Sequence, residues 1–137
     1  MIPETMSDHE TRDYLHRVLA ESLDGKSLRE IFEIAKTHLL TQGVQSIDAG
    51  EDSCCQYRGP NGLKCAIGCF IPDDKYTPLI EGKPIDVSFV RYIKKPYWNL
   101  LAALQNIHDA YPPESWANEL HLLEGTLESY EREWENF

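Results

Sequence analysis

The chain has 137 residues, 42% of them apolar, and its 13 basic and 23 acidic residues give a formal net charge of −10. This length and composition predict a single domain over residues 1–137, with enough core to fold without disulfides or metals. The negative charge disfavours direct binding to nucleic acid, and no apolar run reaches the roughly 18 residues that a membrane-spanning helix needs.

Two amphipathic helices are predicted in the first part of the chain. Ser7 and Ser27 each stand three residues before a glutamate, which is the capping-box pattern that begins a helix. Apolar residues follow both serines at helical spacing. The first helix is expected to end near residue 22, and Gly43 is suited to end the second.

The middle segment, residues 54–82, holds all four cysteines and is the least helix-like part of the chain. Asn61-Gly62 is typical of a tight hairpin turn, and the residues on either side of it alternate in polarity. We therefore predict a small β-hairpin at about 54–66, then one or two helical turns that end at Pro72. The helices are expected to pack around this segment.

Three helical segments are predicted after residue 85. Asp86 is placed to cap a short helix that extends to about residue 93, and Pro96 fits the first turn of a long helix. A final helix is expected to begin near Glu114 and to carry apolar residues as far as Trp134. The predicted fold class is α+β, mostly α, with four to five helices packed around the β-hairpin.

The cysteines leave three roles open. They can pack as small apolar side chains. Cys55, Cys65 and Cys69 are weak candidates for a metal site, although their spacing is not that of zinc knuckles. Cys65 is also a candidate nucleophile with His108 as its base, which would make the protein a Cys-dependent hydrolase. Asp109 follows His108 on the same helix, and adjacent positions point about 100° apart, so we expect Asp109 to be poorly placed to orient the imidazole.

Four residues of the middle segment are candidates for ligand binding: Tyr57, Arg58, Tyr76 and Glu81. Arg58 can hold a carboxylate or phosphate through two parallel hydrogen bonds. Alternatively it braces loop carbonyls or pairs with an acid such as Asp73. A pocket formed by residues 55–82 with Arg58 and His108 would suit a small-molecule or nucleotide-binding, sponge-like protein. No cofactor-binding motif occurs in the sequence, so we expect no cofactor.

The acidic charge is concentrated near the end of the chain. Residues 113–137 contain seven glutamates and one arginine, for a net charge of −6. This stretch is either a solvated helix face or a surface that docks on a basic partner. Under the second interpretation the partner-binding candidates are Glu124, Glu128, Glu131 and Glu135.

The middle segment also resembles a known protein family. Residues 55–73 match the pattern CxYRGxxGxKCAIGCxIPD, which resembles the signature of an uncharacterised family of small bacteriophage and bacterial proteins. The likeness extends to two later stretches and one earlier stretch: residues 104–109, 113–116 and 31–40. It implies a phage or bacterial origin and brings no established activity. The chain departs from the family pattern in its first helix, its doubled Cys54-Cys55 and its Glu-rich end.

The leading functional hypothesis is a non-enzymatic interaction protein. It would bind and inhibit a host protein with a basic surface, such as a nucleic-acid-handling or antiviral-defence factor. A cytoplasmic location in the host bacterium is expected, because the acidic first residues lack a signal-peptide pattern. No membrane contact is expected, and homo-oligomerisation is left open.

Overall fold

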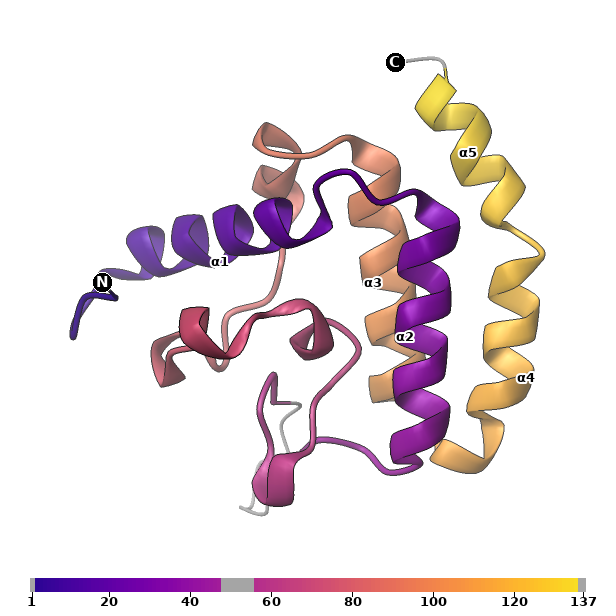
Figure 1. Cartoon of the computed structure of the whole chain (residues 1–137), viewed down its shortest axis with the longest axis horizontal. Coiled ribbons are helices and arrows are strands. Elements are labelled where there is room, and N and C mark those ends of the chain that lie inside the picture. The colour runs from indigo at the N-terminus through magenta and orange to yellow at the C-terminus, as the bar shows by residue number, and fades with distance from the viewer. Residues whose placement is uncertain (1, 48–55, 136–137) are drawn as a thin grey trace.

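The computed structural model describes residues 2–47 and 56–135, with side chains described only as far as residue 132 at the C-terminal end. Within this part the structure contains five α-helices and five short 3₁₀ helices. The α-helices are α1 (Asp8–Leu23), α2 (Leu28–Gln42), α3 (Lys95–Ala110), α4 (Pro113–Glu124) and α5 (Leu127–Glu135) (Figure 1). The 3₁₀ helices lie between α2 and α3: η1 (Pro60–Gly62), η2 (Gly68–Phe70), η3 (Asp73–Lys75), η4 (Pro78–Ile80) and η5 (Val87–Arg91).

The predicted ends of the first two helices are confirmed. Ser7 and Ser27 each accept a hydrogen bond from the backbone of the glutamate three residues on, and each glutamate side chain accepts one from the serine backbone. Gly43 ends α2 in the left-handed region, at φ +68°, which glycine adopts without the steric cost of a Cβ atom.

The predicted β-hairpin at about 54–66 is wrong, because the described residues form no sheet and the fold is all-helical rather than α+β. A tight turn is present, since the Gly59 N–H donates to the Leu63 carbonyl at 2.8 Å and Asn61 has φ +59°. The residues on either side of this turn do not pair as strands. Cys54 and Cys55, at the start of the predicted hairpin, lie outside the described residues.

Side chains from elsewhere in the chain bind the backbone groups that a hairpin would have paired. The N–H groups of Tyr57 and Arg58 donate to the Glu81 carboxylate at 2.9 and 3.0 Å. The Lys64 N–H donates to the Gln42 side-chain oxygen at 2.9 Å. Because these contacts satisfy the backbone without a second strand, the segment folds as turns and 3₁₀ helices instead of a ladder.

The later helical segments follow the prediction with two changes. The short segment after Asp86 is the 3₁₀ helix η5, which the Asp86 carboxylate caps by accepting from the Ser88 N–H at 2.9 Å. The predicted final helix is divided into α4 and α5. At the break, the Thr126 hydroxyl donates to the Leu123 carbonyl at 2.8 Å, which occupies an acceptor that a continuous helix would use.

One hydrophobic core joins the helices to the middle segment. Helix α3 contacts α2, α4, α5 and η5, whereas α1 packs on η2 and η4. Figure 1 shows α2, α3 and the α4–α5 pair side by side, with α1 directed away from them over the 3₁₀ helices. Phe32, Phe89 and Trp116 are fully buried. Within the middle segment, Gly68 lies so close to Tyr57 that an added Cβ would clash with the Tyr57 carbonyl oxygen.

Candidate functional site

The four predicted ligand-binding residues come together around one carboxylate. Glu81 accepts from the Tyr57 N–H through Oε1 at 2.9 Å, and through Oε2 from the Arg58 N–H at 3.0 Å and the Tyr76 hydroxyl at 2.8 Å. Burial, reinforced by the hydrogen bond to Glu81, raises the pKa of Tyr76. We call Tyr57, Arg58, Tyr76 and Glu81 the Glu81 cluster.

The guanidinium of Arg58 is engaged inside the protein. Its Nη2 donates to the Ile71 carbonyl at 2.6 Å, and its Nη1 lies 2.8 Å from Oδ1 of Asp73. The group also stacks over the Tyr76 ring, 5.1 Å from the ring centroid. These contacts match the alternative in which Arg58 braces a loop carbonyl and pairs with Asp73. The Glu81 cluster is therefore built to hold the middle segment together.

His108 is fully buried and both of its ring nitrogens are bonded. The Ser46 N–H donates to Nε2 at 2.9 Å. Because a backbone N–H can only donate, Nδ1 carries the ring proton in the neutral form and donates it to the Asp109 carboxylate at 2.7 Å. The prediction that Asp109 is poorly placed to orient this ring is wrong, since its carboxylate lies within hydrogen-bond distance of the neighbouring imidazole in the last turn of α3. The imidazole also stacks on Trp116, with ring centroids 5.6 Å apart.

The two described cysteines, Cys65 and Cys69, are not in disulfides, and each thiol makes a hydrogen bond to a nearby backbone group. Cys65 is fully buried, and its Sγ accepts from the Gly68 N–H at 3.3 Å. Cys69 donates to the Ala66 carbonyl at 3.2 Å, and burial raises its pKa to about 12. Within the described residues no hydrogen bond joins either thiol to a histidine, and no three His, Cys, Asp or Glu side chains are grouped to hold a metal. Cys55, the remaining metal candidate, lies outside the described residues.

An open groove of about 560 Å³ lies between residues 82–85 and α3. Its size is within the range of small-molecule sites, but neither Arg58 nor His108 lines it. Two of the polar side chains in it are already bonded: Lys83 pairs with Asp8 at 3.2 Å, and Gln105 donates to Asp109 at 2.8 Å. The groove thus shares Tyr57, Ile67 and Gly82 with the predicted pocket of residues 55–82, but it does not include Arg58 or His108.

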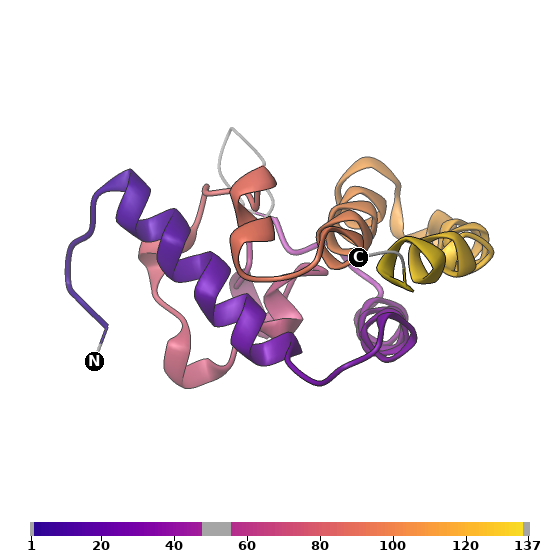
Figure 2. The same cartoon turned by 90° about the horizontal axis from the view of Figure 1, so that it is seen from above.

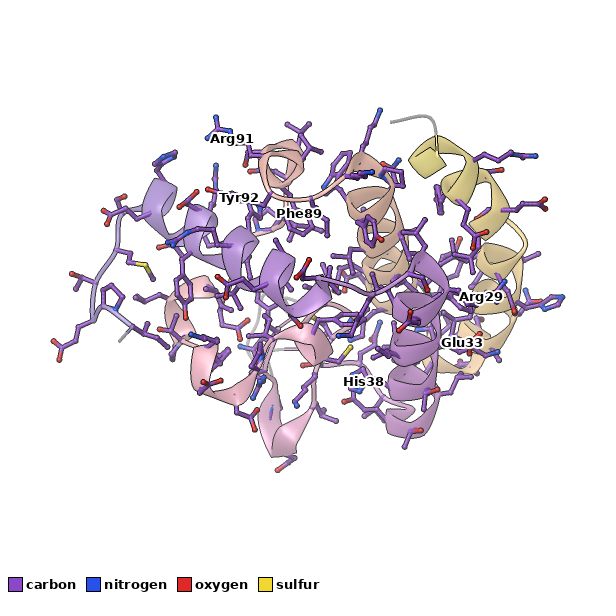
Figure 3. The ribbon with its side chains drawn as sticks, turned by 45° about the horizontal axis from the view of Figure 1, so that its top comes forward. Arg29, Glu33, His38, Phe89, Arg91 and Tyr92 are labelled. Atoms are coloured by element: carbon purple, nitrogen blue, oxygen red, sulfur yellow. The ribbon has the colours of Figure 1, made fainter. Side chains whose placement is uncertain are left out.

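The predicted partner-binding glutamates fall into two groups. Glu124 pairs with Arg29 at 2.8 Å, and this hydrogen bond lowers the pKa of Glu124. Figure 3 shows Arg29 and Glu33 together on α2. Glu128 and Glu131 are exposed on α5 and make no hydrogen bond or ion pair with any described residue. The side chain of Glu135 lies outside the described residues.

Sequence reasoning missed an exposed apolar surface beside three cations. Val87, Val90 and Tyr92 are 65%, 40% and 39% exposed. Within η5, Phe89 is the buried residue, which leaves Val87 and Val90 on the outer side of the 3₁₀ turn. We call this surface the η5 patch, and it consists of Val87, Val90, Arg91, Tyr92, Lys94 and Lys95. In Figure 3, Arg91 lies outside the ribbon and Phe89 lies between η5 and α1. In the sequence, the feature that could have indicated this surface is the cluster of three cations within residues 91–95.

No protein-family model, curated protein or solved structure matches this chain. The resemblance to phage and bacterial proteins therefore stays a prediction. No helix in the described part of the chain has both the length and the apolar character to cross a bilayer.

Proposed function

We propose that the protein is a binding protein whose acidic α5 surface docks on a basic surface of another protein. The observation that carries this proposal is the contrast between two sets of polar groups. The Glu81 cluster, His108 and the two described cysteines are bonded within the fold, whereas Glu128 and Glu131 are exposed without partners among the described residues. Exposed carboxylates of this kind steer association with a positively charged surface.

The partner class follows from the same charge and from the resemblance. A nucleic-acid-handling protein presents a basic surface that an acidic helix can cover. The resemblance implies that this protein has a phage or bacterial origin, so the proposed partner is a host protein of the bacterial cytoplasm. Covering the basic surface of that partner would inhibit it. The net charge of −10 opposes direct contact with nucleic acid itself.

The test is affinity capture from bacterial lysate with matched charge-reversal variants. E128K/E131K reverses the exposed carboxylates of α5. E4K/D74K makes the same change in net charge at two exposed acids that have no partner among the described residues. We expect wild type and E4K/D74K to capture the same basic-surface protein, and E128K/E131K to lose it. A captured protein is then purified and its affinity measured at increasing salt, which should weaken binding steeply. Failure to capture a protein, or equal capture by E128K/E131K, contradicts the proposal.

A further inference from the structure

The η5 patch combines an apolar floor with a cationic rim on an otherwise acidic protein. All of its residues except Arg91, together with Ile93, line an open hollow of about 610 Å³. Single exposed apolar side chains are ordinary, but three of them within six consecutive residues around one hollow indicate an interaction surface.

Two of the three cations of the patch, Arg91 and Lys95, are available to a partner. Arg91 and Lys95 are exposed and form no ion pair or hydrogen bond with any described residue. The first turn of α3, which follows directly, contains no acidic residue to offset them. The Tyr92 hydroxyl donates to Asp13 on α1, which holds the ring in place beside the hollow. An occupant of this surface is expected to present carboxylates to these two cations.

Helix α5 of the same chain has the complementary composition. Its sequence, LESYEREWE, contains four glutamates, of which Glu128 and Glu131 are exposed, whereas Tyr130 packs against the core of its own chain. Figure 2, which views the molecule from above, shows η5 and α5 on either side of α3 and both open to the viewer. We propose that the η5 patch of one molecule binds α5 of a second copy.

The placement of the two surfaces allows a closed dimer. Since η5 and α5 lie at the same end of the molecule, a two-fold axis can bring each η5 patch against the partner's α5, so that the contact is made twice. The other end-to-end arrangement would put η5 on η5 and α5 on α5. That arrangement places like charges together and is disfavoured. Each contact is small, so the dimer is expected to be weak and sensitive to salt.

Charge exchange between two variants tests this pairing. Sedimentation velocity on purified protein should show a wild-type dimer at a low salt concentration of about 0.1 M, where a Debye length of about 10 Å screens the repulsion between two chains of net charge −10 more than it screens close ion pairs. At about 1 M salt, where the Debye length is about 3 Å, the protein should be a monomer. R91E/K95E and E128K/E131K should each be monomeric at low salt. Their equimolar mixture should recover the dimer, because every reversed patch then meets a reversed helix. E4K/D74K should dimerise like wild type, and far-UV circular dichroism should show that all variants are folded.

Three results would overturn the second-copy assignment: a monomeric wild type at low salt, undiminished dimer in either charge-reversal variant, or a mixture that stays monomeric. Wild-type monomer that instead binds phosphatidylserine-containing vesicles, and loses this binding in R91E/K95E, would assign the patch to an anionic membrane surface. Dimerisation does not depend on a partner protein. R91E/K95E keeps α5 intact and should still capture the basic partner, so failure of the dimer and failure of the proposed function are distinguishable.

Discussion

Replacing Glu81 by alanine is expected to destabilise the fold more than any other single carboxylate change in the middle segment. The substitution removes the acceptor of the Tyr57 and Arg58 N–H groups and of the Tyr76 hydroxyl. A hydrogen bond to a charged group contributes about 1.5–3 kcal/mol, and an orphaned buried donor costs about as much. Because the cluster is half-buried and water can replace part of the loss, we expect a decrease of about 3 kcal/mol in the free energy of unfolding.

Three variants separate the contributions to this loss. Glu81→Gln keeps one side-chain oxygen but no charge, and its free energy of unfolding should decrease about half as much as that of Glu81→Ala. Tyr76→Phe removes a single hydrogen bond and should lose about 1 kcal/mol. Glu21→Ala changes an exposed glutamate whose side chain makes no hydrogen bond to a described residue, and should stay within about 0.5 kcal/mol of wild type.

Urea unfolding followed by far-UV circular dichroism measures these differences, and thermal unfolding should show a shift of about 10 °C for Glu81→Ala. The reasoning is refuted if Glu81→Ala is no more destabilising than Glu21→Ala. That result would mean that water satisfies the Tyr57 and Arg58 N–H groups as well as the carboxylate does. The carboxylate would then not explain why the segment lacks a β-hairpin.

Three further predictions concern the buried titratable groups. His108→Ala should lower the free energy of unfolding, measured in urea, by about 2–4 kcal/mol, because it leaves the buried Ser46 N–H without an acceptor and creates a cavity. His108→Gln keeps an acceptor and should lower the free energy of unfolding less. Burial lowers the pKa of His16 and His38 below the ordinary 6.5, so the unfolded state takes up protons first on acidification. Stability should be full above about pH 6.5 and fall below it by up to about 1.4 kcal/mol per pH unit for each histidine; a flat profile of urea midpoints from about pH 7.5 to 5 would contradict this. Iodoacetamide should alkylate Cys69 about 100-fold more slowly in native protein than in urea, since burial raises its pKa to about 12, and equal rates would show that the thiol is accessible.

The helix beginnings could be predicted because their determinants are local. Ser7 and Ser27 find their capping partners three residues away, so the pattern is complete within a single turn. The division between α4 and α5 is also local, but its signal at Thr126 is weak. Both the N–H and the hydroxyl of Thr126 donate to the Leu123 carbonyl, at 2.9 and 2.8 Å, and nothing in the residue types marks this arrangement strongly.

The β-hairpin could not be excluded from the sequence because its competitors are distant. The acceptors that replace the ladder, Glu81 and Gln42, lie 24 and 22 residues from the N–H groups of Tyr57 and Lys64. Tyr57, Arg58, Tyr76 and Glu81 were grouped from the sequence as candidates for ligand binding, and they do meet. Residue types alone could not show that the carboxylate faces backbone N–H groups instead of a ligand, since both are bound by the same chemistry.

The two proposed interactions share α5, so they are thermodynamically linked. A basic partner that binds Glu128 and Glu131 must displace the η5 patch of the second copy, and self-association therefore weakens partner binding by mass action. The linkage is reciprocal, since a bound partner shifts the protein toward monomer to the same extent. R91E/K95E releases α5 without altering it, so this variant should bind the partner at least as tightly as wild type does, with the advantage growing as protein concentration rises. An affinity independent of protein concentration would show that the two surfaces act separately.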